Sequence, residues 1–452
     1  MYDIPGQLLE SLEKRNDFSK DSFLKAHGEA PVVSVRFNPL KTNSKEQLFP
    51  NTAPVFWHPC GFYLEERPSF VMDPLLHAGA YYVQEASSMF VWEILKQTNA
   101  DVGSRVLDLC AAPGGKTTLL ASYFTEGLVV GNEVIRTRAS ILVENASKWG
   151  SGNIVVSNND PKQFAQLPGF FDVLLVDAPC SGSGLFRKET EWREGWSEAN
   201  VALCSQRQKR ILADAYDTLK ENGLLIYSTC SFSQEEDEDI VDWAMDNFAV
   251  ENIPLQLDAS WRIEETFSDK HQARSYRFYP GKARGEGFFV SVFRKKENPG
   301  HPHLNGDSPE RPDKNEQALL NNWVKHPQDL FFYKNGHTFH TMAKSFTEDI
   351  ALLKNRLYLR KGGTEMGEMK GKDLIPSPAL ALSLLNAETT TRHEADYDEA
   401  IRFLRKSDME RKAGMANGWT LVTFKNRALG WVKVLPNRIN NYYPMEWRIR
   451  KT

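Results

Sequence analysis

The chain has 452 residues, a formal net charge of −4, and 41% hydrophobic and 25% charged residues. A chain of this length exceeds one ordinary hydrophobic core, so we expect two or three domains. The composition is that of a soluble globular protein, and no apolar run reaches the roughly 18 residues of a membrane span. The first residues lack the basic and apolar regions of an export signal, which predicts a cytoplasmic protein with no membrane partner.

The five cysteines are an odd number, lie far apart and form no C-x-x-C pair: Cys60, Cys110, Cys180, Cys204 and Cys230. This pattern argues against a disulfide framework and against a zinc site, and it fits a reducing compartment. The ten histidines show no ligand spacing either. We therefore expect no metal.

Residues 1–100 are of mixed character and predict an N-terminal accessory or RNA-binding region with a strand at 32–37 and a helix at 86–96. From 101 to 296, apolar strands alternate with helical segments, which is typical of a parallel α/β sheet. Strands are expected at 105–109, 128–131, 153–156, 172–177 and 224–228, with a late strand at 287–294 closing the sheet, and helices from about 116 and at 136–149, 201–220 and 234–245.

Residues 297–318 have the composition of a linker, 319–392 predict an intermediate domain, and 393–452 form a basic C-terminal segment. From Arg402 to Thr452 there are twelve Lys or Arg against three Asp or Glu. Aromatic residues are interleaved with them: Phe403, Trp419, Phe424, Trp431, Tyr442, Tyr443 and Trp447. Cations with aromatic platforms favour RNA binding, although an aromatic core beneath a solvated basic face would give the same composition.

A loop of small residues follows the first strand of the sheet and precedes a helix: Cys110, Ala111, Ala112, Pro113, Gly114, Gly115, Lys116 and Thr117. Small residues let the backbone approach a ligand, and the helix N-terminus offers free N–H groups. A phosphate-binding Walker A loop needs a glycine where Cys110 stands, and no G-x-G-x-x-G dinucleotide motif is present. S-adenosylmethionine, which has no pyrophosphate, is the ligand that the loop favours.

Two acidic residues follow the next two strands. Glu133 stands roughly 20 residues beyond the loop, where nucleotide folds place the acid that binds ribose hydroxyls. Asp160, after the third strand, is a candidate for the adenine amino group. Glu133 alone would be an ordinary solvated acid, but the set of loop, Glu133 and Asp160 predicts a cofactor site.

Cys180 and Cys230 follow the fourth and fifth strands. Ligands of open parallel sheets bind outside the carboxyl ends of the strands, so both thiols should face one cleft beside the cofactor loop. Carbon 5 of cytosine is too weak a nucleophile to accept a methyl group directly. Addition of a thiolate to carbon 6 activates it, and a base then removes the carbon 5 proton before the thiolate leaves.

Cys230 precedes the helix expected at 234–245, whose N-terminus could lower the pKa of the thiol. Asp177, at the end of the fourth strand, is placed to contact N3 of the base. The acidic run 235–239 is expected to be the solvated first turn of that helix. The residues alone do not settle which thiol attacks, because DNA cytosine-5 methyltransferases carry their nucleophile in a Pro-Cys turn like that at Cys180.

With these motifs the chain resembles the Nop/Sun-type RNA 5-methylcytosine methyltransferases. The resemblance is carried by residues 108–117, 177–182 and 227–231, with further matches at 36–41, 82–89, 277–280 and 286–289. It implies a Rossmann-like class I methyltransferase with a mixed seven-stranded sheet, and an N-terminal α+β region. It also implies S-adenosylmethionine bound by 110–116, Glu133, Asp160 and Asp177, with Cys230 as nucleophile and Cys180 in product release.

The tail between Gly418 and Pro444 resembles the PUA-like domain of bacterial enzymes that act on small-subunit ribosomal RNA. The expected substrate is therefore cytosine in 16S ribosomal RNA or in the small subunit. A transfer RNA cytosine-5 methyltransferase and a non-catalytic ribosome-assembly factor with the same fold are the alternatives. A DNA cytosine methyltransferase fits less well because the chain has a second cysteine turn. A P-loop kinase fits less well because Cys110 stands where the first glycine of the loop belongs.

Overall fold

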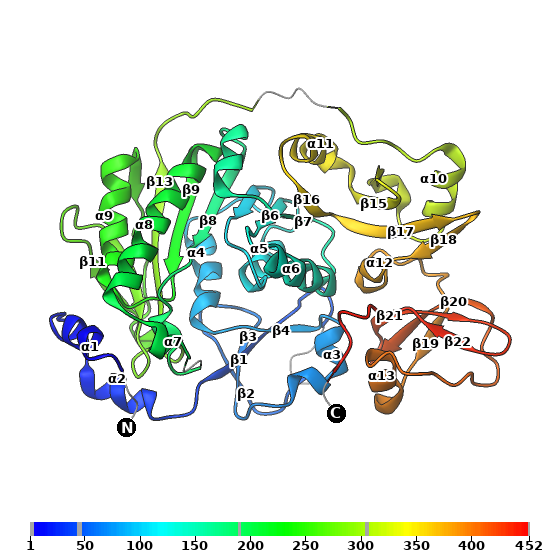
Figure 1. Ribbon diagram of the computed structural model, residues 1–452, viewed down its shortest axis with the longest axis horizontal. Coiled ribbons are helices and arrows are strands. Elements are labelled where there is room, and N and C mark those ends of the chain that lie inside the picture. Colours follow the sequence, from blue (N-terminus) through cyan, green and yellow to red (C-terminus); the bar gives the residue numbers. More distant parts are fainter. Residues whose placement is uncertain (1–3, 43–47, 189–190, 303–306, 451–452) are drawn as a thin grey trace.

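A computed structural model of the chain describes residues 4–42, 48–188, 191–302 and 307–450 (Figure 1). Its centre is a sheet with the strand order β11-β12-β13-β9-β8-β5-β6-β7-β16, and β10 pairs with β13. Its parallel strands are β5 (Arg105–Asp108), β6 (Leu128–Asn132), β7 (Ile154–Ser157), β8 (Phe171–Asp177) and β9 (Leu219–Thr229). The apolar runs of these strands are buried because helices cover both faces of the sheet.

One face of the sheet is covered by α4 (Val91–Gln97), α5 (Gly115–Tyr123) and α6 (Arg136–Trp149). The other is covered by α8 (Glu198–Ala215), α9 (Glu238–Asn247) and α11 (Thr347–Arg356). This is the predicted Rossmann-like arrangement. Helix α6 has the predicted bounds, whereas α8 is shorter than expected and the helix expected at 86–96 is a 3-10 turn (Ser87–Phe90) followed by α4.

The sheet is larger than the expected seven strands. The late strand β13 (Phe288–Lys295) does not close it, because β12 (Arg274–Phe278) and β11 (Glu264–Phe267) lie beyond, and β10 (Val250–Asn252) pairs with the far end of β13. At the opposite edge, β16 (Leu359–Gly362) pairs antiparallel with β7. Part of the segment expected as an intermediate domain therefore extends the central sheet, because β7 otherwise ends it with unpaired backbone groups.

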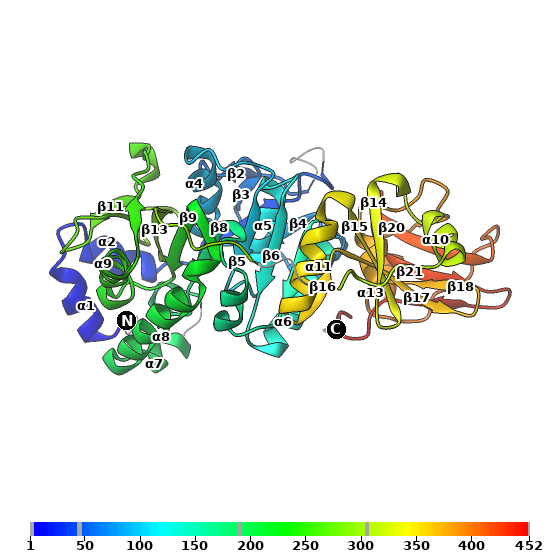
Figure 2. The same ribbon diagram turned by 90° about the horizontal axis from the view of Figure 1, so that it is seen from above.

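The described part of the N-terminal region has three short α-helices and a four-stranded sheet of order β2-β3-β1-β4. Its elements are α1 (Gly6–Glu13), α2 (Lys20–His27), β1 (Val33–Phe37), β2 (Thr52–Pro54), β3 (Gly61–Leu64), α3 (Pro74–His77) and β4 (Tyr81–Val83). Figure 2 shows α1 and α2 at the end of the molecule opposite the C-terminal strands. They pack near the end of β9 in one apolar cluster with Phe186 and Phe232.

The C-terminal part has two further four-stranded sheets, of orders β14-β15-β17-β18 and β19-β20-β21-β22. Their strands are β14 (Leu330–Asn335), β15 (Thr338–Ala343), β17 (Thr364–Lys370), β18 (Asp373–Pro376), β19 (Arg392–Glu394), β20 (Gly418–Phe424), β21 (Arg427–Val434) and β22 (Ile439–Asn441). The accompanying helices are α10 (Lys314–Asn321), α12 (Pro378–Leu382) and α13 (Tyr397–Leu404), while α7 (Glu191–Gly195) belongs to the central region.

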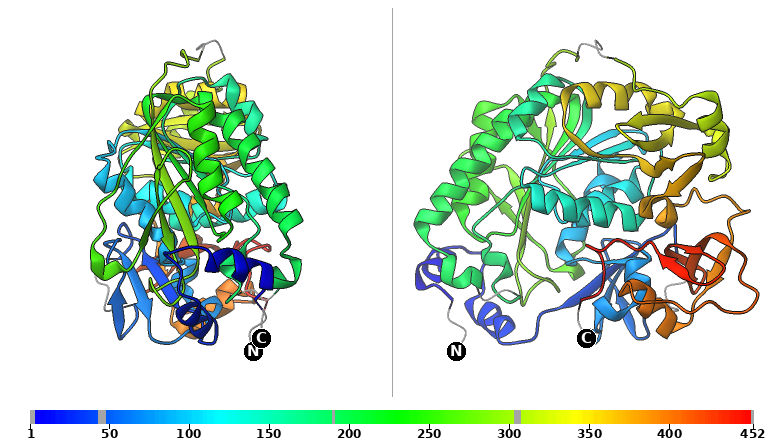
Figure 3. Two further views of the ribbon diagram at one scale, coloured as in Figure 1. Left: turned by 90° about the vertical axis from the view of Figure 1, so that its left-hand side faces the viewer. Right: turned by 45° about the vertical axis from the view of Figure 1, so that its right-hand side comes forward.

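The N-terminal sheet and the C-terminal sheet share one apolar core. Val35 and Phe37 of β1 belong to the same cluster as Phe403 of α13 and Val432 of β21. Figures 1 and 3 show the C-terminal sheet and α13 beside α3. Two regions far apart in the sequence therefore stabilise one another.

Among the described residues, every helix is too short or too polar to cross a bilayer.

Candidate active site

The loop after β5 brings α5 close to the sheet. Gly114, with φ of 114°, precedes α5, and a Cβ there would lie 3.1 Å from Leu142 of α6. A Cβ on Gly131 of β6 would lie 3.0 Å from Thr117, so glycine lets α5 lie this close to β6 without displacing the Thr117 side chain. The backbone of the loop is thereby exposed to a ligand at the carboxyl edge of the sheet, as a nucleoside cofactor requires.

Asn132, which the sequence analysis did not single out, joins three strand ends. Its amide donates to the carbonyls of Leu109 and Asn159 at 3.2 and 3.0 Å, and its Oδ1 accepts from the hydroxyl of Ser157 at 2.8 Å. A buried asparagine with satisfied hydrogen bonds fixes the loops that carry it. The sequence could have indicated Asn132 by its position, one residue before Glu133.

A cavity of about 880 Å³ opens at these strand ends and contains half of the predicted site residues. Its walls include Leu109, Cys110, Ala112, Asn132, Glu133, Ile135, Arg138, Pro161, Asp177, Cys180, Trp192, Arg207, Arg210 and Cys230. A smaller cavity of about 180 Å³ adjoins it and is lined by Gln84, Glu85, Asp108, Cys110, Ala111, Pro113, Gly115, Lys116 and Asp177. The two thiols thus face the same cavity as Glu133.

Asp160 does not line either cavity, although Pro161 lines the larger one. Its carboxylate caps the 3-10 turn Pro161–Gln166 by accepting from the N–H of Lys162 at 3.2 Å. Glu133 is 3% exposed and accepts from the N–H of Ile135 at 2.9 Å, with Arg138 at 3.4 Å. Glu133 therefore faces the cavity more directly than Asp160.

The two predicted thiols are adjacent, with Cys180 Sγ 3.0 Å from Cys230 Sγ. The carbonyl of Cys230 accepts from the N–H of Gly184 at 2.7 Å, and a Cβ on Gly184 would lie 2.6 Å from that oxygen. Only glycine therefore lets the two loops approach so closely. The hydrogen bond to Cys230, together with burial, raises the pKa of the Cys180 thiol.

Asp177 and Lys116 form an ion pair beside the thiols. Lys116 Nζ lies 2.7 Å from Asp177 Oδ2, and Asp177 Oδ1 accepts from the hydroxyl of Ser228 at 2.8 Å. Burial alone would lower the pKa of Lys116, but the charge of Asp177, assisted by Cys230, raises it. Lys116 is therefore a fixed cation between the cofactor loop and Cys230.

The expected helix N-terminus does not follow Cys230, so that prediction was wrong. Residues Gln234–Glu236 form a 3-10 turn, and α9 begins only at Glu238. The N-terminus of α9 therefore lies farther along the chain from Cys230 than expected. Cys230 adds to the raised pKa of Lys116, whose ammonium group is paired with Asp177.

Asp108, at the end of β5, is fully buried beneath the smaller cavity. Thr117 donates to its Oδ2 at 2.7 Å, and its Oδ1 has no partner among the described residues. Burial raises the pKa of Asp108 to about 7, although the Thr117 hydrogen bond opposes this. Burial likewise raises the pKa of the Cys110 thiol, which suits a packing role rather than a reactive one.

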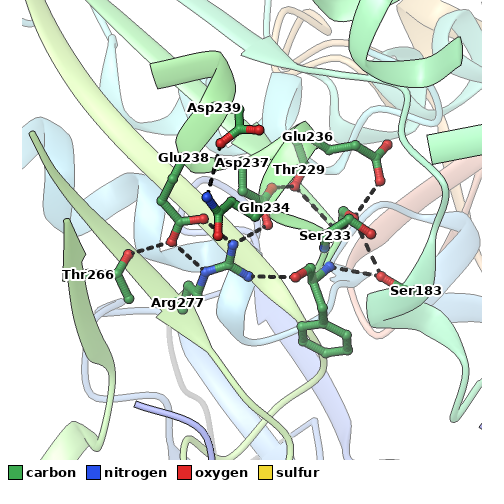
Figure 4. A network of polar contacts seen from close by, with 12 residues as sticks. Ser183, Thr229, Ser233, Gln234, Glu236, Asp237, Glu238, Asp239, Thr266 and Arg277 are labelled. Carbon is green, nitrogen blue, oxygen red and sulfur yellow. Dashed lines mark hydrogen bonds and ion pairs between the residues drawn. The ribbon is translucent and has the colours of Figure 1, made fainter. Parts of the chain in front are cut away.

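The acidic run 235–239 is not a solvated first turn, and this prediction is also corrected. Glu236, Asp237 and Glu238 are buried. Arg277 of β12 lies between the last two, 2.9 Å from Asp237 Oδ2 and 2.8 Å from Glu238 Oε1 (Figure 4). Buried carboxylates persist here because a cation distant in the sequence compensates them, which local charge patterning does not reveal.

The electrostatics of this network depend on Arg277. Burial alone would raise the pKa of Glu238, but the charge of Arg277 lowers it to about 2, and Arg15 of the N-terminal region adds a contact at 2.9 Å. Burial raises the pKa of Asp237, against the opposing charge of Arg277. The network attaches the N-terminal region and β12 to the segment that follows Cys230.

Residues 36–41, which matched the family without a predicted role, dock the N-terminal sheet on the helices of the central region. Arg36 donates to the hydroxyl of Thr118 at 2.6 Å, and Asn38 donates to the carbonyl of Trp149 at 2.9 Å. Lys41 Nζ donates to the carbonyl of Lys148 at 2.7 Å. These side chains satisfy carbonyls of α5 and α6 and so position the N-terminal region.

The aromatic residues of the C-terminal segment divide into two groups. Phe403, Phe424, Trp431 and Tyr443 are buried and form core. Trp419, Tyr442 and Trp447 are half-buried. Trp419 and Tyr442 have ring centroids 4.5 Å apart, and Lys433 Nζ lies 5.2 Å from the Trp419 ring. Part of the set therefore forms an aromatic core, and the other part stays accessible at the surface.

Three family models match successive parts of the chain. Residues 93–294 match the model described as 16S rRNA methyltransferase RsmB/F. Residues 4–86 match the N-terminal domain of 16S rRNA methyltransferase RsmF, and 390–449 match the methyltransferase RsmF PUA domain. Together these three models make the chain similar, over most of its length, to the 16S rRNA methyltransferases RsmB/F. It is a methyltransferase whose cofactor is S-adenosylmethionine, which confirms the predicted fold class, enzyme class and cofactor.

Individual relatives agree with this assignment. The ribosomal RNA small subunit methyltransferase F of Salmonella agona (strain SL483) is 29% identical over 466 residues, covering 97% of this chain and 95% of that protein. Its namesake from Escherichia coli O157:H7 is 28% identical with the same coverage. A solved methyltransferase homologue from Pyrococcus horikoshii is 28% identical with a TM-score of 0.52, covering 65% of this chain and all of that one.

Proposed function

We propose that this enzyme methylates carbon 5 of a cytosine in 16S ribosomal RNA through a covalent bond between Cys230 Sγ and carbon 6 of the base. The observation that carries the proposal is the pair of thiols, 3.0 Å apart, in one cavity with Glu133. The names of relatives that align over 97% of the chain support the choice of small-subunit ribosomal RNA.

The cofactor residues fit S-adenosylmethionine, which when bound supplies an electrophilic methyl group. We assign its ribose hydroxyls to Glu133 and its backbone contacts to residues 110–116. Asp160 is our candidate for the adenine amino group, provided that its carboxylate leaves the N–H of Lys162. Asp177, whose carboxylate is bound by Ser228 and Lys116, is assigned a contact with the cofactor and a contact with the base.

The reaction begins with attack of the Cys230 thiolate on carbon 6. The fixed charge of Lys116 lies beside Asp177, and Asp177 contacts N3 of the ring through a shared proton, because negative charge develops at that atom. Carbon 5 then attacks the donor methyl group. In the final elimination a base takes the proton of carbon 5, and the electron pair of that bond re-forms the double bond to carbon 6 and expels Cys230 as a thiolate. Cys180, beside Cys230, assists this step.

RNA is held by regions outside the cavity. We propose 1–100 and 393–452 as RNA-binding units around a catalytic unit at 101–296, with the segment 319–392 joining them. Trp419 and Tyr442 supply a stacking surface, and Lys433 supplies a charge for phosphate. The cytoplasm is where such a substrate is found.

The decisive experiment is bisulfite sequencing of ribosomal and transfer RNA from cells with and without the gene. We expect a 5-methylcytosine signal in 16S ribosomal RNA that disappears with the gene and returns when the wild-type protein is supplied. A signal lost only from transfer RNA would replace our substrate with the transfer RNA alternative. Unchanged methylation of both would favour an assembly factor and overturn the proposal.

A further inference from the structure

Glu236 lies beneath both cysteine loops and takes no part in the chemistry described above. Its side chain accepts hydrogen bonds from the hydroxyl of Ser181 at 2.5 Å and from the hydroxyl of Ser231 at 2.6 Å. Ser181 follows Cys180 in the chain, and Ser231 follows Cys230. Each catalytic thiol is therefore one residue from a hydroxyl that binds the same carboxylate.

We propose that Glu236 is a positioning residue that sets the separation of the Cys180 and Cys230 thiols through the serine that follows each of them. This inference rests on the proposed covalent mechanism for its consequence in catalysis. The geometrical part of the inference, that Glu236 sets the distance between the two thiols, is independent of the substrate. It also explains why both cysteine motifs have serine in the next position.

The hydrogen bonds around Glu236 are those of an acceptor-only carboxylate. Besides the two hydroxyls, its oxygens accept from the N–H of Ser181 at 2.8 Å and from the amide of Gln208 at 3.2 Å. The two hydroxyls share Oε2, and the two N–H groups share Oε1. A glutamine at this position keeps one acceptor oxygen but presents an NH₂ group to the two hydroxyls, so both serines must accept instead of donate and the charge-assisted hydrogen bonds are lost.

The backbone around Glu236 is itself anchored. Its carbonyl accepts from the hydroxyl of Tyr227 at 2.6 Å, and the next residue, Asp237, accepts from Thr229 at 2.6 Å. Figure 4 shows Glu236 on one side of this network and Arg277, which holds Glu238, on the other. The carboxylate is thus attached to a rigid base, and it can restrain the more exposed loops above it.

Catalysis should depend on this restraint because both thiols act on one pyrimidine ring. Cys230 must reach carbon 6, and Cys180 must stay beside it for elimination. A displacement of about 1 Å in a reacting group can cost roughly a hundredfold in rate. Loss of Glu236 should therefore lower kcat while leaving the cofactor loop, which it does not contact, unchanged.

The first test needs no RNA. Full-length wild type, Glu236→Gln and Glu235→Gln are treated with diamide, an azo oxidant that takes two electrons and two protons from a thiol pair to leave a disulfide. Peptide mapping follows the Cys180–Cys230 bridge. Glu235 is the exposed neighbour and serves as the matched control. We expect the bridge to form at least about fivefold more slowly in Glu236→Gln only, because disulfide formation needs close, oriented thiols.

The second test measures methyl transfer to 16S ribosomal RNA. We expect kcat to fall at least about tenfold in Glu236→Gln, with KM and cofactor affinity within about twofold of wild type. Ser181→Ala and Ser231→Ala remove single hydroxyls, preserve the buried charge and should shift both readouts in the same direction by less. These variants keep the test decisive if Glu236→Gln does not fold.

The two failures are distinguishable. If wild type forms the bridge but transfers no methyl group to RNA, the proposed function is wrong and the positioning role stands. If bridge formation and kcat are the same in the Glu236 and serine variants as in wild type, the positioning role is wrong whatever the substrate.

Discussion

The catalytic edge of the central sheet and the C-terminal sheet at β20–β22 use polar residues in opposite ways. At the catalytic edge, Glu236, Asp237 and Arg277 are buried and bound to fixed partners. In the C-terminal sheet, Trp419, Tyr442 and the neighbouring Lys433 are only half-buried. Chemistry on one carbon atom needs fixed geometry, whereas contact with a long RNA needs charge and accessible rings.

If this contrast is correct, single changes at the catalytic edge should have larger effects than changes in the C-terminal sheet. The largest effect is expected for Cys230→Ala. Because Cys230 forms the covalent bond, methyl transfer should fall by about a thousandfold or more. Transfer of labelled methyl groups to 16S ribosomal RNA measures it, with Cys60→Ala as control. Full activity of the Cys230 variant would exclude the covalent mechanism proposed above.

Cys180→Ala should trap the enzyme on its RNA. If Cys180 serves the elimination step, its loss leaves the bond between Cys230 and carbon 6 intact after methyl transfer. A denaturing gel should show a protein–RNA adduct in this variant, which is lost when Cys230 is also replaced. Rapid turnover without an adduct would remove Cys180 from the release step.

Arg277→Ala should destabilise the fold strongly, because it leaves Asp237 and Glu238 buried without their cation. Breaking a buried pair in this way costs about 3–5 kcal/mol. Arg274, on the same strand, forms a partly exposed pair with Glu265, and Arg274→Ala should cost no more than about 1 kcal/mol. Denaturant unfolding compares the two variants, and equal losses would show that the burial of the network does not matter.

In the C-terminal sheet, Trp419→Ala should weaken RNA binding by about 1–3 kcal/mol, the value of one stacked base. Lys433→Met should lower the salt dependence of binding by about one phosphate contact. Fluorescence titrations at several salt concentrations measure both. Cofactor affinity should not change in either variant. Unaltered RNA affinity would leave this surface as the solvated face of a small domain.

The smallest effect is expected at His77, the last residue of α3, whose side chain lies against the hydroxyl of Tyr443. Burial lowers the pKa of His77 from 6.5 to about 4. The unfolded chain binds the proton more readily, so this contribution to stability is intact above pH 6.5 and is lost as pH falls toward 4. Between pH 7 and 5.5 the loss is about 1 kcal/mol, and His77→Gln should remove that part of the pH dependence.

The sequence predicts the parts of the site that depend on local pattern. Cys180, Cys230 and Asp177 follow apolar strands, and parallel strands necessarily bring their carboxyl ends to one edge. The role of Glu236 depends on Ser181, in another loop, and the burial of Glu238 depends on Arg277. Strand β16 was missed for the same reason, because its partner β7 lies about 200 residues earlier and its own short sequence has no strong alternation.

The core shared by β1 and β21 also has a consequence for synthesis. Val35 and Phe37 leave the ribosome early, but Phe403 and Val432, which belong to the same apolar core, are made last. Until translation is nearly complete, the nascent N-terminal sheet must present an uncovered apolar face, which exposes the growing chain to aggregation and to chaperones. A chain truncated before residue 390 would keep that exposed state permanently, so premature termination should yield insoluble protein rather than a free catalytic domain.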